Sequence, residues 1–99
     1  MTSRYYNREG KPLTLMEWAT LFEDVTSRRI AETTLPNGTW VSTVWLGLDH
    51  SFDKGPPLIF ETMVFSSRES MHELGLERYA TEAEASEGHK RIVEKWSNL

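Results

Sequence analysis

The chain has 99 residues, of which 38% are hydrophobic and 11% aromatic, and its formal net charge is −4. This composition predicts one globular domain over residues 1–99 and excludes an intrinsically disordered protein. The acidic balance argues against a nucleic-acid partner, the lack of cysteine excludes disulfides and thiolate metal sites, and no apolar run is long enough to cross a membrane.

The first predicted helix begins at the stretch TLME, residues 14–17, which has the spacing of a capping box. One apolar face follows at helical spacing and consists of Leu15, Trp18, Ala19 and Phe22. We therefore predict a helix over residues 14–24. Upstream of it, a turn signal at residues 7–10 follows two tyrosines and indicates a short N-terminal hairpin or edge strand.

Asn37 and Gly38 stand between two β-like runs and form a strong hairpin signal, because a type I′ turn requires positive φ at both positions. The first run covers residues 28–35 and the second starts at Trp40. We expect a two-residue turn, which places Leu35 opposite Trp40 and sets the register of the hairpin.

A third strand is predicted over residues 58–65, where large apolar groups on both faces are typical of a central strand. A fourth, short strand is expected over residues 76–80. The stretch TEAE, residues 81–84, is a second capping box and opens a helix over residues 82–97. The fold class is therefore α+β: a three- to four-stranded antiparallel sheet with a central Asn-Gly hairpin and two helices, in the order α-β-β-β-(β)-α.

The loop of residues 47–57 is longer than an ordinary hairpin connection and holds Asp49, His50 and Asp53. Asp49 could orient His50 as a general base, or the loop could contribute to a cation site. The other interpretation is a polar connection with a rigid Gly-Pro-Pro exit, in which Phe52 anchors the loop over the sheet. No motif fixes a metal geometry, so we predict no metal and no cofactor.

Two ionisable residues lie in segments that are otherwise apolar. Glu61 is in the third strand, where a buried carboxylate needs a partner, and the candidates are Arg28, Arg29, Arg78 and His89. His89 itself interrupts the apolar stripe of the last helix. Each has a structural interpretation, as an ion pair or a satisfied core histidine, and a functional one, because such groups also mark sites. The candidate ligand-binding residues are Asp49, His50, Glu61, Arg78 and His89.

Trp40 and Trp45 are five positions apart in one predicted strand and therefore point to opposite sides of the sheet. Both cannot enter a core on one side. One of them is thus a candidate for a partner or dimer interface, where tryptophan often anchors binding. The alternative is that the N-terminal segment covers this indole or that it is simply half exposed.

The segments LMEWATLFED, RRIAETTLPNGTWVSTVWLGLDHSFDKGPPLIFETMVF and ERYATEAEASEGHKRIVEKW occur in this order and resemble a family of small proteins encoded by actinobacterial phages and prophages. The resemblance extends from about Tyr5 to Trp96. It carries over no catalytic or ligand-binding residue. It implies a phage accessory protein in the bacterial cytoplasm, a class that often binds host factors or sequesters small signals of host defence.

Three functions are consistent with these features. The first is a non-catalytic protein that binds a host protein, or itself as a homodimer, in the cytoplasm, a location that the lack of cysteine also favours. The second is a protein that binds or sequesters a small ligand such as a nucleotide signal. The third is a small hydrolase that uses Asp49 and His50.

Overall fold

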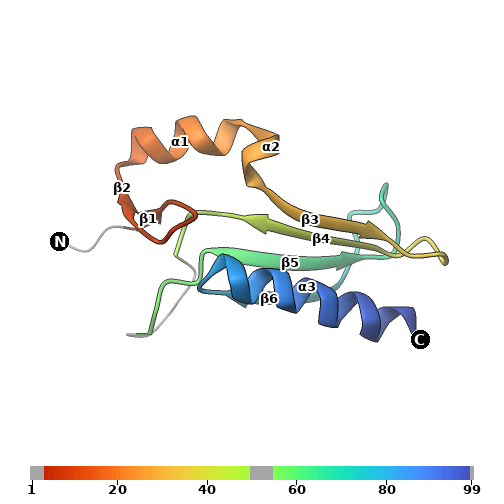
Figure 1. Ribbon diagram of the computed structural model, residues 1–99. Coiled ribbons are helices and arrows are strands. Elements are labelled where there is room, and N and C mark those ends of the chain that lie inside the picture. The colour runs from red at the N-terminus through yellow and green to blue at the C-terminus, as the bar shows by residue number, and fades with distance from the viewer. Residues whose placement is uncertain (1–3, 50–54, 99) are drawn as a thin grey trace.

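The structure is a computed structural model that describes residues 4–49 and 55–98, and it confirms the α+β class (Figure 1). The elements in chain order are β1 (Tyr5–Tyr6), β2 (Pro12–Leu13), α1 (Leu15–Glu23), α2 (Val25–Arg28), β3 (Arg29–Thr34), β4 (Trp40–Trp45), β5 (Phe60–Phe65), β6 (Glu73–Tyr79) and α3 (Glu82–Ser97). The β1–β2 hairpin agrees with the short N-terminal hairpin that the turn signal indicated, although the predicted order of elements did not include it. The short helix α2 was not predicted. Within these residues, no helix is both long and apolar enough to cross a membrane.

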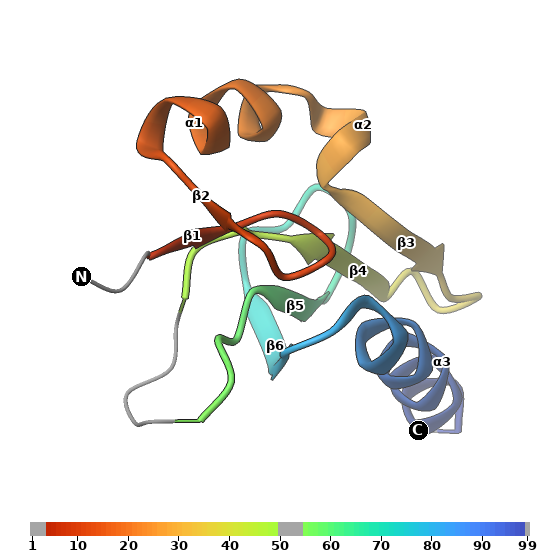
Figure 2. The same ribbon diagram turned by 60° about the vertical axis from the view of Figure 1, so that its left-hand side comes forward.

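The main sheet is antiparallel, with the strand order β3-β4-β5-β6. Consecutive strands are thus neighbours, and β3 and β6 are the two edges. Helix α3 contacts all four strands and runs along one face of the sheet (Figures 1 and 2). Helix α1 instead packs on the β1–β2 hairpin and on α2, at one end of the sheet. The sheet therefore has one face under α3 and one face without a long helix in the described part of the chain.

Helix α1 begins as predicted, because both hydrogen bonds of the capping box are present. The backbone N–H of Glu17 donates to Thr14 Oγ1 at 3.2 Å, and the Glu17 carboxylate accepts from the Thr14 N–H at 2.8 Å. The predicted apolar face is used only in part, since α1 has no buried residue and Leu15 is 56% exposed. Trp18 and Phe22 alone pack against the core. The helix is attached mainly through two aromatic rings.

The predicted register of the β3–β4 hairpin is wrong by one residue. The Leu35 N–H donates to the Thr39 carbonyl at 2.8 Å, and Thr34 lies opposite Trp40. The loop therefore has three residues and ends at Gly38, whose φ of 92° is the left-handed value that three-residue hairpin loops place there. A one-residue slip exchanges the faces of a strand. Hence Thr34, and not Leu35, shares a face with Trp40.

The core lies between the sheet on one side and α3, α1 and the β1–β2 hairpin on the other, and its largest fully buried side chains include Trp45, Phe60 and Ile59. Strand β6 starts three residues earlier than predicted, because Gly75 is a strand residue that packs below Trp96 instead of a loop glycine. Gly88 of α3 lies against the ring of Tyr79, where a Cβ would overlap it. Small residues thus set how closely the helix and sheet approach.

Candidate functional site

The best candidate for a functional surface is the face of the sheet that points away from α3, here called the open face. Strand alternation and the observed pairing place on it one set of side chains from each of the four strands. These residues are Glu32, Thr34, Trp40, Ser42, Val44, Glu61, Met63, Phe65, Leu76 and Arg78. Unlike the face under α3, it mixes apolar and charged groups.

Trp40 is the largest side chain of this face and lies where β4 begins. Its ring stacks on Phe65, with 5.4 Å between ring centroids and 27° between ring planes. The guanidinium of Arg68, from the loop that joins β5 to β6, lies 5.1 Å from the Trp40 ring centroid and forms an ion pair with Glu32 at 3.1 Å. The loop after β5 is thereby drawn across the open face toward β3.

Three further arginines lie on or beside the open face, toward the end of the strands opposite the Trp40–Phe65 pair. Arg29 pairs with Glu32 at 3.4 Å, and Arg78 pairs with Glu61 at 3.0 Å, which satisfies the buried carboxylate as predicted. Arg28 stacks its guanidinium 4.6 Å from the ring centroid of Phe22. Residues of α2, β3 and β4 enclose a recess of about 170 Å³ at this corner of the open face.

The candidate ligand-binding residues do not form one pocket. Glu61 and Arg78 lie on the open face, whereas His89 is a residue of α3 that is buried against the opposite face of the sheet. The Asp49 carboxylate accepts a hydrogen bond from the Leu58 N–H at 3.1 Å and so joins the two ends of its loop. His50 lies outside the described residues, as do Phe52 and Asp53 with their predicted anchoring and cation roles.

His89 belongs to a buried hydroxyl network. Its Nδ1 is 2.7 Å from Thr43 Oγ1 and its Nε2 is 2.9 Å from Thr33 Oγ1. The hydroxyl of Thr43 is in turn hydrogen-bonded to the hydroxyl of Thr62, which also accepts a hydrogen bond from the Tyr79 hydroxyl. A neutral ring that accepts at Nδ1 and donates at Nε2 satisfies both of its nitrogens. We therefore assign His89 a structural role.

Burial lowers the pKa of His89 below its ordinary value of 6.5. As the pH falls through 6.5, His89 takes up a proton in the unfolded chain but stays neutral in the folded protein. The contribution of His89 to the free energy of unfolding is therefore fully present above about pH 7.5 and is lost as the pH falls toward its lowered pKa in the folded state. We expect the melting temperature of the wild type to fall between pH 7.5 and 5.5 more steeply than that of His89→Gln. His72→Gln, in an exposed loop, should retain the wild-type slope, and equal slopes for all three would contradict the assignment.

Trp45 is removed as an interface candidate, because it is 1% exposed and its indole N–H donates to the Tyr6 carbonyl at 3.1 Å. The prediction that the two strand tryptophans point to opposite sides of the sheet is correct. Trp45 fills the core below α1 and the β1–β2 hairpin, and Trp40 lies on the open face. Trp40 thus remains the candidate of the two.

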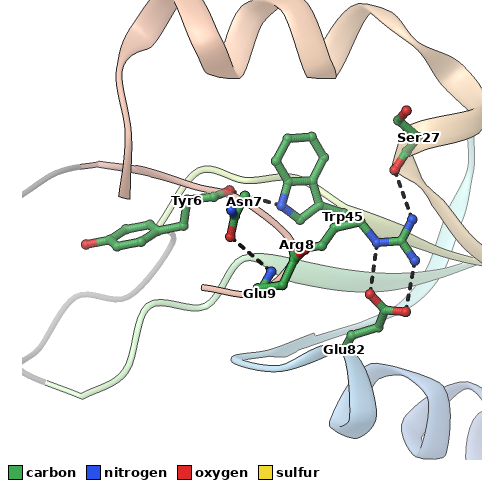
Figure 3. Close-up of polar contacts among 7 residues, drawn as sticks. All are labelled: Tyr6, Asn7, Arg8, Glu9, Ser27, Trp45 and Glu82. Atoms are coloured by element: carbon green, nitrogen blue, oxygen red, sulfur yellow. Dashed lines mark hydrogen bonds and ion pairs between the residues drawn. The ribbon is translucent and has the colours of Figure 1, made fainter. Parts of the chain in front are cut away.

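A cavity of about 270 Å³ lies beside Arg8, a residue that the sequence analysis missed. Arg8 donates to both carboxylate oxygens of Glu82 at 2.9 Å and to the Ser27 carbonyl at 3.3 Å (Figure 3). These hydrogen bonds lower the pKa of Glu82. Arg8 thereby ties the hairpin turn to α2 and to the start of α3, 74 positions away in sequence, which is a structural role.

Neither cavity reaches the roughly 300–1,000 Å³ of sites for drug-sized ligands. Among the described residues, no three histidine or acidic side chains are grouped so that they could hold a metal ion. No protein-family model matches the chain, and neither does any curated protein or solved structure. The open face, with its aromatic stack and its arginines, is therefore the best candidate for a functional surface.

Proposed function

We propose that the protein is a non-catalytic binding protein, which holds an acidic segment of a bacterial host protein against the open face. The observation that carries the proposal is the Trp40–Phe65 stack, flanked by Arg68 and by the recess beside Arg28. The resemblance to phage-encoded proteins supplies the rest of the proposal: a phage accessory protein that works in the cytoplasm of its host.

The composition of the open face supports a protein partner. Tryptophan and arginine are the residues most enriched among energetic anchors of interfaces, and aromatic residues and methionine are common at interface cores. Leu76 is 44% exposed opposite Met63 and extends the apolar strip to the β6 edge. A partner laid along this strip would cover aromatic and aliphatic groups at its centre and charged groups at its rim.

The charge of this face supports a partner other than a second copy. Four of the seven arginines of the chain, Arg28, Arg29, Arg68 and Arg78, lie on or beside it, although the whole chain carries a net charge of −4. The carboxylates there are Glu32, Glu61 and, opposite Phe65, Glu73. A two-fold symmetric dimer would bring two copies of this arginine-rich face together, where like charges that lie opposite one another are costly. An acidic partner segment complements the patch.

The test is affinity purification of the tagged protein from an actinobacterial host, followed by calorimetry with the purified partner. Trp40→Ala is expected to weaken the dissociation constant about 30-fold, which corresponds to the roughly 2 kcal/mol of an interface anchor. Met16→Ala is the matched control, because Met16 is 75% exposed on α1, away from the open face. It should bind as the wild type does.

Circular dichroism must first show that Trp40→Ala retains the fold. If the folded variant binds the partner as tightly as the wild type, the open face is not the binding surface. If light scattering instead shows a homodimer that Trp40→Ala separates, the occupant is a second copy and the host-protein proposal is wrong.

A further inference from the structure

Two side chains that line the recess at the corner of the open face each carry a buried hydrogen-bond donor that has no acceptor. The lining of the recess comes from the end of α2, the start of β3 and the outward side of β4, and consists of Val25, Arg28, Arg29, Glu32, Trp40, Ser42 and Val44. The Nε of Arg28 and the Nε1 of Trp40 are screened from water and unpaired. Both belong to side chains that line this one recess.

Unpaired buried donors are exceptional, because desolvation without a hydrogen bond is costly. Other indoles of this chain show the usual arrangement. The Trp18 N–H donates to the Leu46 carbonyl at 2.8 Å, and the Trp45 N–H donates to the Tyr6 carbonyl at 3.1 Å. Trp40 therefore differs from its own counterparts, and Arg28 also forms no ion pair within residues 4–49 and 55–98.

We infer that this recess receives the carboxylate of a glutamate or aspartate side chain from the partner segment, an inference that rests on the proposed function. A carboxylate has only acceptors, and if its entry rotates the two side chains so that their covered donors turn toward it, it would accept from Arg28 Nε and from Trp40 Nε1. At about 30 Å³ for each water, a recess of about 170 Å³ has room for about five waters, enough for the end of an acidic side chain. The guanidinium stacked on Phe22 supplies the countercharge.

A single negative charge suits the recess better than a phosphate. Glu32 also lines it, and this carboxylate is held by Arg29 and Arg68. A dianionic group would face Glu32 at close range, whereas one carboxylate is balanced by Arg28. The aliphatic side chains of Val25 and Val44 suit the methylene groups that precede a side-chain carboxylate.

The test uses nitrogen-labelled protein and amide-blocked amino acids as probes, so that it does not depend on the partner. Titration with N-acetyl-glutamate amide is expected to shift the side-chain N–H signals of Trp40 and Arg28. The indole signals of Trp18 and Trp45 should stay in place, as internal controls with paired donors. N-acetyl-glutamine amide, which has the same shape without the charge, should leave all four signals unchanged.

Two variants test the two donors one at a time. Arg28→Gln is expected to abolish the shift of Trp40, and Trp40→Phe, which retains an aromatic ring without the N–H, should weaken probe binding. Arg91→Gln, on the exposed side of α3, should behave as the wild type does. With the purified partner, Arg28→Gln should weaken binding about tenfold or more, as for the loss of a hydrogen bond to a charged group.

Equal responses to the glutamate and glutamine probes would overturn the inference, and so would a larger response to inorganic phosphate. If the probe binds as expected but no host partner depends on Trp40, the recess is a carboxylate site and the proposed function fails. If the partner depends on Trp40 but not on Arg28, the proposed function holds and the inference about the recess is wrong.

Discussion

Replacing Gly47 by alanine is expected to destabilise the fold by about 2–5 kcal/mol. Gly47 has a φ of 72°, where a residue with a Cβ pays roughly 1–2 kcal/mol. A Cβ there would also overlap the Trp45 ring and lie 2.7 Å from Cδ1 of Trp18. Both indoles are held by hydrogen bonds to backbone carbonyls, so neither can move freely, and overpacking adds about 1–3 kcal/mol. Urea denaturation measures the change.

Gly10→Ala is the matched control for this substitution. Gly10 also has a positive φ, of 86°, but a Cβ at Gly10 would meet no atom within 4 Å. The control should therefore lose only the stability that a residue with a Cβ loses at a positive φ, about 1 kcal/mol. Equal losses for the two variants would mean that the indoles make room at Gly47 and that the packing around it is loose.

Trp45→Ala is expected to cost about 3–5 kcal/mol, the range for an aromatic residue removed from a core. Trp45 is 1% exposed and packs against Tyr6, whose carbonyl would lose its indole donor, and against Phe22. For a domain of 99 residues, a loss of this size approaches the lower end of typical total stability. Thermal denaturation should show a melting temperature reduced by at least 10 °C, at about 4–8 °C per kcal/mol.

Trp40→Ala provides the comparison on the other face of the same strand. Trp40 is only half-buried, and the substitution removes the ring contacts with Phe65 and Arg68 but opens no cavity in the core. Its stability loss should be clearly smaller than that of Trp45→Ala. A loss as large as that of Trp45→Ala would show that Trp40 is mainly a structural residue.

Helices α1 and α3 and the central strand β5 could be predicted from local signals, because capping and periodicity act over a few residues. The box at Thr14 forms both of its bonds, and α3 spans its predicted residues. The hairpin register could not be predicted, since Asn37-Gly38 fits both a two-residue turn and the last two positions of a three-residue one. That slip matters for the site, because register decides which β3 residues lie beside Trp40.

The candidate site was only partly visible in the sequence. Alternation along β4 identified Trp40 and Trp45 as pointing apart, and the partner of Glu61 is Arg78, one of four candidates that the sequence offered. The recess could not be foreseen, because it depends on α2, a single turn that carries no periodic signal. Its two unpaired donors are properties of tertiary packing and have no counterpart in spacing or composition.

The weak attachment of α1 has a consequence for the recess. A helix with no buried residue, held by Trp18 and Phe22, belongs to the part of a fold that opens before global unfolding. Val25 and Arg28 follow directly in α2, so such an opening would take one wall of the recess away. An occupant binds only the docked population, and its apparent affinity is reduced by the undocked fraction. By linkage, the same occupant makes the opening of α1 less favourable. Binding at Trp40 and docking of the N-terminal helix are therefore coupled equilibria.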